Sequence, residues 1–135
     1  MAKVSGITTS VTIDNAAGAG KNISNDIRSI NVTTPRGVED ITGLDKSAVE
    51  RLLLLADFTG TMNGIFNTAA DMSHAVLKTC VSSAATRTMV IAYPGPATLT
   101  AEVVLSDYNV EHGTGGELTW TCNFALANGT APVWS

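Results

Sequence analysis

Alternating hydrophobic and polar residues run through much of the chain and predict extended strands. The clearest run is 118–126, where large apolar residues alternate with small residues. A period of two places the two sets on opposite faces of a strand. The apolar set, expected to face the core, is Leu118, Trp120, Cys122, Phe124 and Leu126, and the other set is Thr119, Thr121, Asn123 and Ala125.

Weaker patterns of the same kind predict further strands. They cover 7–14, 23–34, 58–67, 86–93 and 99–109, with 38–42 continuing the second strand beyond Pro35. Glycine- and proline-containing stretches at 15–22, 94–96 and 113–116 separate them as turns or loops. The pattern therefore predicts six or seven mostly antiparallel strands, forming a β-sandwich or β-barrel.

One segment, 71–82, has the period of a helix. Met72, Ala75, Val76 and Cys80 form one apolar stripe, and Asp71 is placed to cap the first turn. We expect one α-helix here, on the flank of the sheets.

The segment 44–57 is ambiguous. Ser47 and Glu50 match a capping box, and the residues from Arg51 to Ala56 are good helix formers, so local rules predict a helix. Four consecutive leucines, 52–55, cover more than one face, so such a helix would have to be buried on several sides. A short helix and an extended loop both remain open.

Composition points to one domain of 135 residues with a weakly charged surface. Charged residues make up 15% of the chain, against about 25% on average, and the net charge is −4. No basic run is present, which argues against tight binding of DNA phosphates. The start of the chain lacks the apolar stretch of a signal peptide, and no run is long enough to span a bilayer, so we expect cytoplasmic assembly without membrane insertion.

The residues that could carry chemistry do not form a site in the sequence. The stretch 18–21 resembles a phosphate loop, but Asn15 and Asn22 stand where that motif needs Gly and Ser or Thr. Ser73 and His74 follow Asp71 at the start of one helix, where capping residues are common. The two Cys and two His lack the spacing of metal ligands. We therefore expect no enzyme activity, no cofactor and no metal, and a structural role instead.

Four stretches together resemble the tail tube proteins, or major tail proteins, of long-tailed non-contractile bacteriophages. They are 40–52, 58–67, 73–78 and 117–135, and their order and spacing carry the resemblance. It implies a single tail tube domain over 1–135, built of two packed antiparallel sheets with one flanking α-helix. It also implies a structural virion protein whose hexameric rings stack into a tube.

The resemblance further implies partners and a location. In this family the strands of six copies line a lumen that holds the tape-measure protein and later conducts double-stranded DNA without specific binding. Terminator and tip proteins close the tube ends, the tube is part of the virion tail, and assembly occurs in the host cytoplasm. The long early loop and a terminal arm bridge to the next ring.

These implications assign roles to particular residues. For 44–57 we expect contacts between subunits, and a second set in the tail 128–135. The contact candidates are Leu52, Leu53, Leu54, Leu55, Asp45, Lys46, Glu50, Arg51, Pro132 and Trp134, and the lumen candidates are Thr119, Thr121 and Asn123. The tail could instead fold back over its own sheet. Two other functions remain open: a tube protein of a contractile tail or injection machine, and a small β-barrel that binds a ligand.

Overall fold

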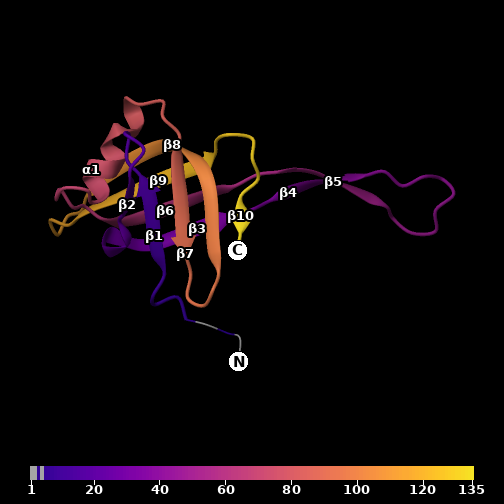
Figure 1. The fold of residues 1–135 in the computed structure, drawn as a ribbon, viewed down its shortest axis with the longest axis horizontal. Coiled ribbons are helices and arrows are strands. Elements are labelled where there is room, and N and C mark those ends of the chain that lie inside the picture. Colours follow the sequence, from indigo (N-terminus) through magenta and orange to yellow (C-terminus); the bar gives the residue numbers. More distant parts are fainter. Residues whose placement is uncertain (1–2, 4) are drawn as a thin grey trace.

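The computed structural model describes Lys3 and residues 5–135. Within these residues the chain forms ten strands, one α-helix and two short 3-10 helices (Figure 1). The elements are β1 (Ser10–Asp14), β2 (Gly20–Asn22), η1 (Ser24–Asp26), β3 (Ile27–Thr33), β4 (Arg36–Asp40), β5 (Arg51–Ala56), β6 (Thr59–Ile65), α1 (Ser73–Leu77), η2 (Lys78–Val81), β7 (Arg87–Ala92), β8 (Thr98–His112), β9 (Leu118–Leu126) and β10 (Val133–Trp134).

One large antiparallel sheet folds over itself to make two layers. Its strand order is β2-β1-β7-β8-β9-β6-β3, with β10 added beside β8. The 15 residues of β8 belong to both layers: its first part pairs with β7 as far as Val103, and its second part pairs with β9 from Val103 onward. A register shift between Leu105 and Asp107 lies in the second part. The predicted mainly β fold with two packed antiparallel layers and a flanking helix is confirmed.

The core lies between the two layers. Trp120, Cys122 and Phe124 are buried as the alternation predicts, and the ring of Phe124 packs 5.6 Å from that of Phe58. Leu126 is half-buried against the core. The prediction for Leu118 is wrong, because this residue pairs with His112 at the end of the sheet and remains 38% exposed.

The helix is shorter than predicted and begins differently. Its α-helical part is Ser73–Leu77, followed by the 3-10 turn Lys78–Val81. Asp71 is not the cap: it has a φ of 63°, and the N–H of Ser73 donates to the Asp26 carboxylate at 2.9 Å. A residue 47 positions away thus satisfies a backbone donor at the helix start.

The strands β4 and β5 form a hairpin, hereafter the arm (residues 36–56), that projects from the body of the molecule (Figure 1). Of the two alternatives left open for 44–57, the helix does not form. The Arg51–Ala56 segment is a strand because β4 supplies it with ladder partners, whereas a helix there would have no surface to bury its leucines. Ser47 and Glu50 lie in the connection between the strands, where Glu50 N–H donates to Thr42 Oγ1 at 2.8 Å.

Candidate functional site

The arm exposes apolar side chains on both of its faces. All residues from 36 to 55 are exposed in the single chain. Eight large apolar side chains of the arm are exposed by 42% or more: Val38, Ile41, Leu44, Val49, Leu52, Leu53, Leu54 and Leu55. Strand alternation puts Leu52 and Leu53 on opposite faces of β5, and a register shift interrupts the alternation between Leu53 and Ala56, so neither face is polar. A contiguous exposed apolar surface of this kind marks an interaction site.

Polar contacts give the arm a defined shape without covering its leucines. Arg36 Nε donates to the Leu54 carbonyl at 2.7 Å, and Arg51 lies directly opposite Asp40 in the ladder. Thr42 donates to Asp40 through its hydroxyl and its N–H, and these two bonds lower the pKa of the Asp40 carboxyl.

The structure therefore gathers eight of the ten contact candidates on one element. Leu52, Leu53, Leu54, Leu55 and Arg51 belong to β5, and Asp45, Lys46 and Glu50 belong to its connection with β4.

A second surface is the outer face of the layer formed by β3, β6, β9 and the second part of β8. The three predicted lumen residues, Thr119, Thr121 and Asn123, lie on it as expected from the alternation of β9. The ladder registers place further residues beside them: Ser29, Asn31 and Thr33 on β3, Thr59, Thr61, Asn63 and Ile65 on β6, Ala125 on β9, and Val104, Asp107, Asn109 and Glu111 on β8. Most are small and polar, two are acidic, and none of those named is basic.

The two acidic residues of this polar sheet face were missed by the sequence analysis. The register shift between Leu105 and Asp107 changes which residues of β8 face outward, so simple alternation along 99–109 does not place Asp107 or Glu111. Asp107 accepts hydrogen bonds from the backbone N–H and side-chain amide of Asn123, at 3.0 to 3.1 Å. The ladder with β9 places them instead: Asp107 lies opposite Asn123 and Glu111 lies opposite Thr119, so both share the face of these two residues.

Both lateral edges of the same layer lack a strand partner in the described part of the chain. There, β3 pairs only with β6, and the part of β8 beyond Val103 pairs only with β9. Open edges present rows of unpaired N–H and C=O groups to any strand that approaches.

The tail 128–135 folds back over its own sheet. β10 pairs with Leu99 and Thr100 of β8, and Ser135 exchanges two backbone hydrogen bonds with Thr98. Trp134 stacks on Tyr93 with the ring centroids 5.9 Å apart, and remains 51% exposed. The remaining contact candidates, Pro132 and Trp134, thus lie on the body of the molecule, remote in sequence from the arm.

The residues that resembled catalytic or phosphate motifs have structural partners. Lys21 forms an ion pair with Asp71 at 3.4 Å. Ser73 Oγ donates to the Ile65 carbonyl, whereas His74 Nδ1 lies 3.0 Å from the Tyr108 hydroxyl, so the two side chains are directed to different groups. Over Lys3 and 5–135, His, Cys, Asp and Glu form no group of three or more that could hold a metal ion. No helix in that part of the chain has the length and apolarity to cross a bilayer.

Comparison with known proteins gives likeness of structure without likeness of sequence. No protein-family model and no curated protein matches the sequence. Among solved structures, a chain from the tail of an empty gene transfer agent particle with C6 symmetry matches with a TM-score of 0.79 and 15% identity, over 98% of this chain and 99% of that one. A chain from the virion of the native gene transfer agent matches with a TM-score of 0.78 and 14% identity, over 98% and 99%.

A third structure extends the likeness to another particle. A chain from the six-fold symmetrised baseplate of the anti-feeding prophage matches with a TM-score of 0.65 and 12% identity, over 100% of this chain and 96% of that one. The whole chain therefore has the fold found in these tail and baseplate particles. This likeness confirms, at the level of fold, the resemblance to tail tube proteins.

Proposed function

We propose that this protein is a structural subunit of a tail tube, in which rings of six copies stack into a hollow conduit for double-stranded DNA. The observation that carries the proposal is the arm. It exposes eight large apolar side chains that the single chain leaves uncovered, so they need a surface on another molecule. The likeness to a chain of a C6-symmetric tail supports a second copy as that molecule and six as the number.

The open edges of the polar layer give a route to ring closure. Pairing β3 of one copy with the second part of β8 of the next would satisfy both edges with one repeated contact. Such a contact joins two different surfaces, and a contact of this type generates a ring when the rotation closes. Six four-stranded layers would then form one continuous wall. The arm, which projects from the body, is free to reach an adjacent ring, as are Pro132 and Trp134 of the tail.

In such a ring the polar sheet face would line the lumen. Its Thr, Ser and Asn side chains present no cation to DNA phosphates, and Asp107 and Glu111 repel them. A passage of this kind lets the genome slide through without being held. The same lumen would hold the tape-measure protein during assembly, with terminator and tip proteins at the tube ends. The protein would act in the virion tail after assembly in the host cytoplasm, without catalysis.

A second candidate is a ring component of a baseplate in an injection machine. The likeness to the baseplate chain of the anti-feeding prophage supports it. Such a component would form rings whose stacking stops after one or a few layers.

Electron microscopy of the purified protein at increasing concentration tests the proposal. We expect long tubes of constant width with six-fold symmetry in cross-section. Isolated six-fold rings would favour the baseplate candidate. Monomers at every concentration would contradict both.

A further inference from the structure

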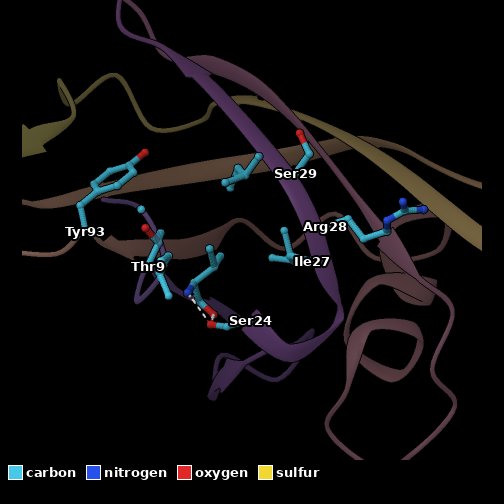
Figure 2. A pocket seen from close by; sticks show the side chains of 10 residues that line it. Thr9, Ser24, Ile27, Arg28, Ser29 and Tyr93 are labelled. Carbon is cyan, nitrogen blue, oxygen red and sulfur yellow. Dashed lines mark hydrogen bonds between the residues drawn. The ribbon is translucent and has the colours of Figure 1, made fainter. Parts of the chain in front are cut away.

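A cavity of about 370 Å³ opens between the two layers at the β3 edge (Figure 2). Apolar side chains from β1 and β3 contribute much of its lining, including Val11, Ile27 and Ile30, and Tyr93 borders it from the end of β7. Figure 2 shows Tyr93 and Thr9 on one side of it and Ile27 on the other. Its volume lies within the range of roughly 300–1,000 Å³ typical of pockets that bury apolar groups.

The surroundings of this cavity combine apolar side chains with the hydroxyl groups of Thr9, Ser24 and Ser29 and one positive charge. Ile7, which lines it, is 89% exposed, and Trp134 stacks on its border residue Tyr93. Arg28 is the one charged side chain among the described residues that line it. Arg28 belongs to the bulge of β3, and its side chain points away from the other labelled residues (Figure 2).

One face of the arm has the complementary character. Leu52 and Leu54 lie on the same face of β5, and Glu39 lies directly opposite Leu52 in the ladder, so its carboxylate stands beside these leucines. On the opposite face the nearest acid, Asp40, is already opposite Arg51. The face with Glu39 therefore combines two exposed leucines with a carboxylate that has no cation across the ladder.

We propose that the arm of a second copy docks on this cavity, with Leu52 and Leu54 inserted between the layers and Glu39 paired with Arg28. The arm of the same chain projects away from its body, so the occupant comes from another copy (Figure 1). The docking joins two different surfaces and can therefore propagate from copy to copy. This inference rests on the proposed self-assembly and names the surface that receives the arm.

A charge-reversal cycle tests the pairing. Arg28→Glu and Glu39→Arg each place like charges together, and we expect each to raise the critical concentration for assembly about tenfold or more, since like charges at an interface cost several kcal/mol. The double variant restores the pair and should assemble within about threefold of wild type. Glu39→Arg combined with Lys78→Glu is the matched control, because it has the same net charge as the double variant. Lys78 lies on η2, away from Arg28 in the sequence, so this control should assemble no better than Glu39→Arg alone. Wild-type assembly by both single variants, or failure of the double variant to assemble, contradicts the pairing.

Disulfide crosslinking tests the docking independently of the charges. In a background of Cys80→Ser and Cys122→Ala, protein carrying Ile30→Cys is mixed with tagged protein carrying Leu54→Cys and oxidised. We expect the mixed dimer as the main product on a non-reducing gel. The control pair, Leu44→Cys with Ile30→Cys, should give little mixed dimer.

The two hypotheses fail in different ways. If wild-type protein forms tubes but Ile30→Cys and Leu54→Cys do not crosslink, the proposed docking is wrong and the proposed tube function is retained. If no tubes form but this pair crosslinks in small oligomers, the docking stands and the tube is wrong.

Discussion

At the residue scale, two buried charged side chains hold the short helix on the sheet. Asp26, 3% exposed, accepts hydrogen bonds from Ser73 N–H and from the Asn67 side-chain amide, at 2.9 and 3.0 Å. Arg87, 1% exposed, donates to the Val76 carbonyl and the Thr79 hydroxyl at the other end of the helix. A helix of five residues has too few internal bonds to be stable alone, so these side chains supply partners for its ends.

We predict that Asp26→Ala destabilises the monomer by about 2–4 kcal/mol. The change removes the acceptor from the buried Ser73 N–H and from the half-buried Asn67 amide, and a buried donor left without a partner costs roughly 1–3 kcal/mol. Urea unfolding followed by fluorescence measures the loss. Asp45→Ala, on the exposed arm, is the control and should leave the free energy of unfolding unchanged. Equal stability of Asp26→Ala and wild type would show that the carboxylate does not hold the helix.

The two thiols should differ in reactivity. Burial raises the pKa of Cys122 to about 12 and also raises that of Cys80, but Cys122 is fully buried whereas Cys80 is half-buried. A raised pKa lowers the fraction of reactive thiolate at pH 8. We expect a thiol reagent to label Cys80 slowly in the folded monomer and Cys122 only after unfolding in urea, as read by mass spectrometry. The Cys80→Ser variant should remain unlabelled until urea is added, and rapid labelling of that variant would contradict the buried position of Cys122.

At the element scale, alternation predicts the body of the fold well and the arm poorly. In β9 and β7 buried residues alternate with less buried ones, exposed or half-buried in β9 and half-buried in β7, so the sequence pattern shows which face of each strand meets the core. β5 exposes leucines on both faces in the single chain, and four consecutive leucines have no period that distinguishes a strand from a helix. Its conformation depends on pairing with β4, which local sequence rules do not include.

The same limit applies to the candidate site. Thr119, Thr121 and Asn123 were placed on a common face by sequence because β9 is regular, whereas Asp107 and Glu111 depend on a register shift that only the pairing shows. The tail is a further case. Asn128-Gly129 predicts a turn, and Gly129 indeed has a φ of 73°, but where β10 returns depends on its pairing with Thr100 and Leu99.

We predict that Leu53→Asp combined with Leu54→Asp abolishes assembly and leaves the monomer stable. Both side chains are more than 40% exposed, so the free energy of unfolding should change by less than about 1 kcal/mol. Thermal unfolding measures stability, and sedimentation with electron microscopy measures assembly. Val81→Asp changes an exposed apolar residue outside the arm and serves as the control. If the double variant forms tubes at the wild-type concentration, the arm is not an assembly contact.

At the scale of the whole molecule, the proposed association uses different residues from those that form the core. The core residues lie in the body, between the two layers, whereas half of the large apolar side chains exposed within Lys3 and 5–135 lie on the arm. Because few residues serve both purposes, a monomer can fold first and polymerise later. If the arm is the assembly contact, its variants should therefore block assembly without unfolding the subunit.

The polar sheet face gives the most direct test of the conduit. A tube whose lumen carries no Lys or Arg should not retain a short DNA duplex, even at low salt, because no phosphate is neutralised. Thr121→Lys adds one cation per subunit at the centre of this face, and in a ring of six the cations would act together. We expect tubes of this variant, assembled with the duplex, to retain it in a form protected from nuclease, with affinity falling steeply as salt increases.

A lysine on the other layer distinguishes the lumen from the outside of the tube. Thr12 lies on β1 between the buried residues Val11 and Ile13, so its side chain points away from the core on the layer opposite to the polar sheet face. Thr12→Lys adds the same charge, and any DNA that its tubes bind should be cut by nuclease. Protection by Thr12→Lys and not by Thr121→Lys would mean that the layers are reversed and that β1 and β7 line the lumen. Retention of DNA by wild-type tubes would contradict a lumen lined by the polar sheet face, because the residues of that face supply no cation to bind phosphates.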